Sequence, residues 1–202
     1  MQAKYRVAIP LAMQAGDVPG LAMVVLEKGK TAKIAGFGVR CYGKPEPVTA
    51  DTFFPAASLT KPVFAYAVHK LVENGILDLD VPLDSYLPQP YLPTDTQAAA
   101  TTARHVLSHQ SGFPNWREKN KLLRTKWPPG IRFSYSGEGF IYLQRVVEHV
   151  TGQRLDAHLQ EHVFDPLNMH NSTLVWQSFI EERAAWGYGN NRNWPCIKTM
   201  YR

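Results

Sequence analysis

The chain has 202 residues, of which 45% are hydrophobic and 19% are charged. A chain of this length and composition can bury a substantial core, which excludes a disordered tail and the fibrous and repeat classes. Lysine and arginine outnumber aspartate and glutamate by 22 to 17, so the net charge is +5.

The sequence gives no sign of a membrane segment. No apolar run approaches the roughly 20 residues that a membrane-spanning helix needs. The first ten residues include basic side chains, but Pro10 interrupts them before an apolar stretch of signal-peptide length develops. We therefore expect no membrane span and, by default, a cytoplasmic location.

The densest basic stretch lies in the second half of the chain and consists of Arg117, Lys119, Lys121, Arg124 and Lys126. Such a stretch could bind nucleic acid, but no recognition motif accompanies it. A solvated loop is the favoured interpretation, and we expect no nucleic-acid partner.

The predicted elements begin with a hairpin over 20–39, in which an apolar run, a Lys-Gly-Lys turn and a second strand follow one another. After a proline-rich loop, apolar residues recur at helical spacing over 58–74, and Gly75 ends this helix. A connector with several prolines then covers 77–93 and is predicted to be a surface loop.

Three further helices are predicted. The first covers 104–109 and is capped by Thr101 or Thr102; the others cover 138–150 and 155–164. A weak strand is predicted over 172–176. Nothing in the sequence marks a flexible linker, so we expect one domain over 1–202, made of the hairpin at 20–39, a helical and loop region at 58–170 and a carboxy-terminal part at 171–202.

The motif Ser-x-x-Lys opens the helix predicted over 58–74. Ser58 and Lys61 are three residues apart, so they share one face of that helix. A serine hydroxyl becomes a good nucleophile when a neighbouring group takes its proton. The pattern is common, however, and Ser58 could also be a simple helix N-cap.

A second candidate is Tyr135, which lies between small residues after Pro128-Pro129-Gly130 and just before the helix at 138–150. A tight turn there could present its phenol to a cleft, where a nearby lysine would let it act as acid and base. A core tyrosine with a satisfied hydroxyl is the alternative.

His105 and His109 are four residues apart, which could suggest a metal pair. No HExxH glutamate stands between them and no third ligand is evident. We therefore expect neither a metal site nor a cofactor.

Taken together, these motifs resemble one known family, the class C beta-lactamase-related serine hydrolases, which include penicillin-binding esterases and D-alanyl-D-alanine peptidases. Their order and spacing match over roughly 15–190, and the segments that carry the resemblance are 18–22, 36–39, 54–62, 77–80, 105–112, 135–137 and 164–169. The resemblance implies an α/β (α+β) fold with an antiparallel sheet flanked by helices and a separate helical region.

The resemblance also implies roles for single residues. Ser58 would be the acylated nucleophile, Lys61 its proton partner, and Tyr135 the group that relays the proton to the leaving group. The segment 105–112 resembles a structural helix-turn of the family and receives no catalytic role.

The sequence departs from the family pattern in two places. The third position of the Tyr-x-Asn motif is Gly137, so the amide that would hold a lactam side chain is absent. The Lys-Thr-Gly strand is not found either: Lys198-Thr199-Met200 lacks the glycine, and coincidence is the favoured interpretation. We therefore expect a domain without its last strands.

These inferences predict a serine hydrolase that forms an acyl-enzyme with a small ester, an amide, a beta-lactam or a D-amino-acid peptide of peptidoglycan type. The alternative is a non-catalytic remnant of the same fold, a pseudoenzyme or binding module. An open edge on the hairpin at 20–39 would also favour self-association.

Overall fold

The computed structural model describes residues 3–187, and the chain divides into two compact units. The first, which we call the hairpin unit, consists of Met1–Ala57 and Asn171–Arg202. The second, the helical unit, consists of Ser58–His170. Lys198-Thr199-Met200, considered above as a third motif, lies outside the described residues.

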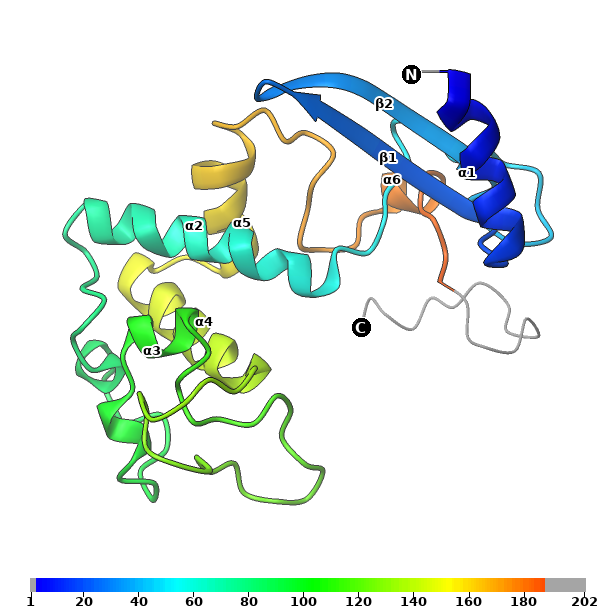
Figure 1. Ribbon diagram of the computed structural model, residues 1–202. Coiled ribbons are helices and arrows are strands. Elements are labelled where there is room, and N and C mark those ends of the chain that lie inside the picture. The colour runs from blue at the N-terminus through cyan, green and yellow to red at the C-terminus, as the bar shows by residue number, and fades with distance from the viewer. Residues whose placement is uncertain (1–2, 188–202) are drawn as a thin grey trace. The chain divides into compact units, whose positions relative to one another are not determined.

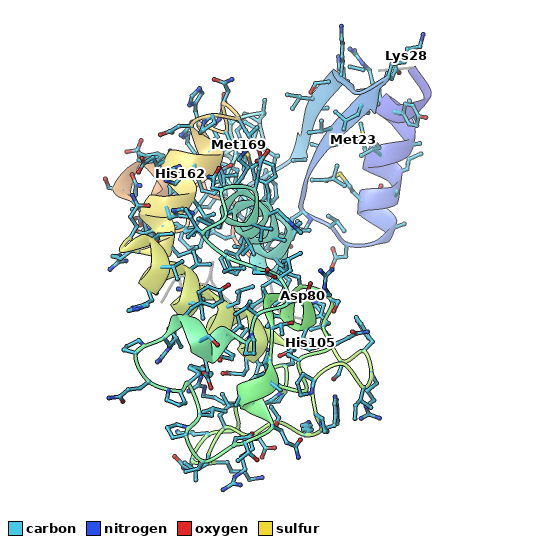
Figure 2. The ribbon with its side chains drawn as sticks, turned by 90° about the vertical axis from the view of Figure 1, so that its left-hand side faces the viewer. Met23, Lys28, Asp80, His105, His162 and Met169 are labelled. Carbon is cyan, nitrogen blue, oxygen red and sulfur yellow. The ribbon has the colours of Figure 1, made fainter. Side chains whose placement is uncertain are left out.

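The hairpin unit is built on two antiparallel strands, β1 (Gly20–Glu27) and β2 (Lys30–Gly38), as the sequence predicts (Figure 1). Lys28 and Gly29 form the turn, with φ values of 50° and 74°. Two residues with positive φ match the right-handed twist of the flanking strands, so the turn closes a tight hairpin. Lys28 marks its tip in Figure 2.

The two faces of the hairpin differ in exposure. The side chains of Leu21, Met23 and Val25 are half-buried, whereas those of Val24, Leu26 and Ile34 are 57%, 66% and 49% exposed. Within residues 3–187, the sheet has no third strand. The hairpin therefore presents an apolar face to solvent.

Two helices of this unit were not expected from the sequence. Helix α1 (Ala3–Ala15) contains Pro10 in its interior and lies alongside the hairpin (Figure 1). Helix α6 (Ser178–Glu181) is a single short turn.

The strand predicted over 172–176 is wrong, because no regular strand forms there. The Thr173 hydroxyl donates to the Val175 carbonyl and accepts from the Val175 N–H, at 3.1 and 3.2 Å. These local side-chain bonds occupy backbone groups that a strand would offer to a neighbour.

The helical unit contains the predicted helices, with small changes at their ends. Helix α2 (Thr60–Glu73) is preceded by a 3₁₀ turn, η1 (Ala57–Leu59), and is followed by Gly75 at φ 69°. Helix α3 (Ala103–Leu107) is capped by Thr102. Helix α4 (Gly137–Thr151) ends at the left-handed Gly152, and α5 (Leu155–Leu159) continues into a π-helical turn, Gln160–Phe164.

The core of this unit lies between α2, α3 and α4. Each helix contributes apolar residues at helical spacing to one buried face. The buried members from these helices are Phe64, Val68, Leu71, Ala103, Val106, Tyr142, Leu143, Val146 and Val147.

The connector before α3 is tied down by an ion pair. Asp80 accepts two hydrogen bonds from Arg104, from Nε at 2.5 Å and from Nη2 at 2.7 Å. Figure 2 labels Asp80 beside His105 at this point.

The described helices are all too short or too polar to cross a membrane.

Candidate active site

Ser58 and Lys61 meet at the start of α2. Ser58 lies in η1, one turn before Lys61, and the Lys61 Nζ donates to the Ser58 Oγ at 3.2 Å. The Ser58 side chain is exposed, while Lys61 is half-buried. The N-cap interpretation of Ser58 is wrong, because Leu59 occupies that position and no side chain caps the helix.

The residue before Ser58 has an unusual backbone. Ala57 adopts a φ of 44°, in the left-handed region that non-glycine residues rarely visit. This conformation costs roughly 1–2 kcal/mol for an L-residue with a Cβ. Strain of this kind gathers where a chain must aim a functional side chain, and here it lies directly beside the candidate nucleophile.

Tyr135 comes to the same place from the loop before α4. Its side chain is 40% exposed, so it is not the core tyrosine of the alternative interpretation. The Lys61 Nζ lies 4.9 Å from the centre of its ring. The pKa of the Tyr135 phenol is lowered, first by hydrogen bonding to Lys61, then by hydrogen bonding to Ser58. The structure thus brings all three predicted residues together.

The loop that carries Tyr135 is held by the turn after α3. Gly130 donates its N–H to the Gln110 carbonyl at 2.8 Å, and Lys126 donates its N–H to the Gly112 carbonyl at 2.9 Å. Gly112 has a φ of 78°, and a Cβ on it would lie 2.1 Å from the Trp127 carbonyl oxygen. The turn therefore serves as a backbone support for the loop.

The glycine at position 137 has a steric reason in this structure. Its N–H donates to both the main-chain and the side-chain oxygen of Asn115, each at 3.1 Å. A Cβ on Gly137 would lie 2.6 Å from the Asn115 carbonyl oxygen. An asparagine at this position would therefore require the 113–117 loop to move.

An ion pair between the half-exposed Arg117 and the buried Glu138 fixes the other end of that loop. Glu138, in the first turn of α4, is 2% exposed and accepts from the Arg117 Nη2 at 2.6 Å. It also accepts from the Arg117 main-chain N–H and Nε, both at 3.1 Å. The negative charge at the amino-terminal end of α4 is favourable as well. This pair joins the loop to the helix that follows Tyr135.

The basic stretch 117–126 is an irregular loop with exposed lysines. Arg117 binds Glu138, and Lys121 forms an ion pair with Glu118. The side chain of Arg132 lies 3.7 Å from the centre of the Trp127 ring.

The two histidines considered as a metal pair have separate partners. His105 belongs to the capping box of α3, where its Nδ1 accepts from the Thr102 N–H at 3.2 Å. His109 Nδ1 instead accepts from the Ser136 N–H at 3.1 Å. The contacts made by His109, Asn115 and Arg117 had no signal in the sequence, because their partners are 21 to 27 residues away.

The sequence matches known proteins over most of its length. The sequence model of the beta-lactamase family matches residues 8–201. Penicillin-binding protein 4 of Amycolatopsis lactamdurans is 32% identical over 184 residues, which cover 83% of this chain and 48% of that protein.

Two solved structures share the fold. The octameric penicillin-binding protein homologue from Pyrococcus abyssi gives a TM-score of 0.80 at 25% identity, over 98% of this chain and 50% of the other. A class C beta-lactamase gives a TM-score of 0.82 at 24% identity, over 98% and 56%. The chain spans about half the length of these relatives. It belongs to the beta-lactamase family of serine hydrolases, and its fold is that of the class C beta-lactamases and penicillin-binding proteins.

Proposed function

We propose that the protein is a serine hydrolase that works through an acyl-enzyme on a small ester, an amide, a beta-lactam or a D-amino-acid peptide. The observation that carries this proposal is the 3.2 Å contact between Lys61 Nζ and Ser58 Oγ, with the Tyr135 phenol beside both. A hydroxyl, an ammonium and a phenol in mutual contact provide a nucleophile and a route for its proton.

In the acylation step, the Ser58 Oγ attacks the carbonyl carbon of the substrate. Before this step, the pair formed by Lys61 and Tyr135 holds one proton fewer than its fully protonated form. The pair can therefore accept the proton of Ser58. The lowered pKa of Tyr135 favours this state. Tyr135 then gives the proton to the leaving oxygen or nitrogen as the bond to the carbonyl carbon breaks.

In the deacylation step, a water molecule gives a proton to the same pair while its oxygen attacks the ester carbon. The bond from that carbon to Ser58 Oγ breaks, Oγ recovers the proton, and a carboxylic acid leaves. The Ser58 N–H, at the amino-terminal end of α2, would stabilise the negative oxygen in both steps.

Covalent labelling tests this proposal. The protein is exposed to a fluorophosphonate and, separately, to a penicillin, and the adduct is mapped by mass spectrometry. We expect one adduct on Ser58 that disappears in Ser58→Ala. An adduct that survives this substitution, or that maps to Ser136, would contradict the assignment.

Lys61→Ala tests the proton route. We expect labelling to slow by roughly 10²-fold or more, since the serine loses the group that takes part in its proton transfer. Lys70→Ala is the matched control, because Lys70 lies on the same helix and pairs with the exposed Glu73. Equal labelling rates in the two variants would leave Lys61 without a role in the reaction.

Tyr135→Phe removes only the hydroxyl. A relay role predicts a loss of roughly 10²-fold in labelling, and a packing role predicts almost none. Tyr66→Phe is the control, because Tyr66 is 43% exposed and Tyr135 is 40% exposed.

The alternative is a non-catalytic remnant that binds a ligand of the same type without turnover. Titration with a penicillin would then show reversible binding, and mass spectrometry would find no adduct on Ser58.

A further inference from the structure

His109 holds the backbone on both sides of Tyr135. The His109 carbonyl accepts from the Ser134 N–H at 2.7 Å, and its Nδ1 accepts from the Ser136 N–H at 3.1 Å. One residue thus fixes the amides directly before and after the tyrosine. Because a backbone held at both neighbours cannot rotate freely, these bonds restrict where the phenol points.

The ring of His109 also packs on the tyrosine. The centres of the two rings are 4.3 Å apart, at an angle of 32°. The same imidazole lies 5.2 Å from Phe140 of α4 and 5.8 Å from Phe133 of the loop. The phenol of Tyr135 therefore packs against the His109 ring, and the Lys61 Nζ lies 4.9 Å from the centre of the same phenol ring.

These contacts require a neutral imidazole. Nδ1 can accept from the Ser136 N–H only while it carries no proton. The titratable groups that face His109 are Lys61 from α2 and Tyr135 from the loop. Burial lowers the pKa of His109, and the positive charge of Lys61 lowers it further.

Ser136, which donates to His109, also caps the start of α4. The Ser136 Oγ caps that helix by accepting from the Gly139 N–H at 2.9 Å, and it donates to the Pro114 carbonyl at 2.9 Å. Ser136 is 1% exposed, so a change in its bond to His109 has no compensating water close at hand.

We infer that His109 is a positioning residue that, while neutral, holds the Tyr135 phenol against Lys61 and Ser58. Protonation of His109 releases the Ser136 N–H and loosens the phenol. This inference rests on the proposed function only for its effect on the reaction. The hold on Tyr135 can be measured without any turnover.

The first experiment needs no substitution. The Ser136 amide and the His109 ring are followed by NMR from pH 8 to pH 5. We expect the Ser136 amide proton to shift with the same midpoint as the His109 ring, below the ordinary value of 6.5. A flat Ser136 signal over that range would overturn the inference.

The second experiment follows the Tyr135 phenol in protein labelled with carbon-13 at tyrosine Cζ, with the signal assigned by its loss in Tyr135→Phe. In His109→Phe, which keeps a ring but has no acceptor, we expect the pKa of Tyr135 to rise toward 10 and labelling of Ser58 to slow roughly 10- to 100-fold. His109→Asn should recover most of both, since asparagine tolerates the φ of 55° at this position and its oxygen can replace Nδ1.

His105→Ala is the control for general damage to this turn. It removes the capping contact with Thr102, so it lowers stability, but it should leave the titration of Tyr135 unchanged. An unchanged Tyr135 titration in folded His109→Phe would overturn the inference, even if Ser58 is labelled normally. A shifted Tyr135 titration in a protein that never labels would refute the hydrolase and leave the positioning role intact.

Discussion

Similar apolar side chains are buried in one unit of the chain and exposed in the other. In the helical unit Leu143 is fully buried, whereas in the hairpin unit Leu26 is 66% exposed. Glu138 of the helical unit is buried but has a complete set of partners from Arg117. The described helical unit thus has its own core, and it carries all three candidate catalytic residues. The comparison indicates that the geometry of the site depends on the helical unit.

The same substitution made in both units tests the difference in burial between them. Leu143→Ala should lower the free energy of unfolding by about 2–5 kcal/mol, because it leaves a cavity in the core. Leu26→Ala should change it by less than about 0.5 kcal/mol, because the side chain is exposed. Urea unfolding of the two variants measures both values, and equal losses would contradict the distinction between the units.

The ion pair of the buried Glu138 with the half-exposed Arg117 gives the next largest effect. Arg117→Ala leaves the Glu138 carboxylate buried without its main partner, and we expect a loss of about 3 kcal/mol in the free energy of unfolding. Lys119→Ala, in the same loop, should cost about 0–0.5 kcal/mol. Thermal and urea unfolding compare the two, and a similar loss in both variants would mean that the pair does not anchor the loop.

Acid pH should affect the stability of the helical unit in particular, because all seven histidines lie in that unit. Burial lowers the pKa of His105, His109 and His158 below the ordinary value of 6.5. The folded state therefore binds fewer protons than the unfolded chain between the folded and the unfolded pKa. The contribution of these neutral histidines to the free energy of unfolding is complete above pH 6.5. It is lost as the pH falls through their pKa values in the folded state.

Urea midpoints at pH 7.5 and pH 5.5 test this prediction, with the midpoint lower at pH 5.5. Replacing the 4%-exposed His158 by glutamine should reduce the difference between the two pH values. A midpoint that rises toward pH 5.5 would contradict the sign of these shifts.

The smallest effect on stability is expected on the hairpin, where association is the informative measurement. The exposed pair Val24 and Ile34 lies opposite in the strand register, with Leu26 beside it. An open strand edge with apolar side chains favours pairing between copies. Leu26→Lys should lower self-association in analytical ultracentrifugation while changing stability by less than about 0.5 kcal/mol. Equal association in the variant and the original chain would exclude this surface as the cause.

Local signals in the sequence were sufficient for much of the architecture. The hairpin follows from two strand-like runs around a Lys-Gly turn, and α2 and α4 follow from apolar residues at helical spacing. These features depend on contacts within a few residues, which the sequence shows directly. The same reasoning missed α1, which has Pro10 in its interior, and wrongly placed a strand at 172–176, where Thr173 binds the backbone locally.

The contact between Ser58 and Lys61 can be predicted from the sequence, because residues three apart on a helical turn share a side. The approach of Tyr135 to this pair, and the contacts of His109 with the tyrosine and its neighbours, depend on the folding of the whole helical unit. His109 and Ser136 are 27 residues apart, and Arg117 and Glu138 are 21 apart. Such contacts leave no periodic trace in the sequence, since they form only when α2, α3 and α4 pack into one core and bring their ends together.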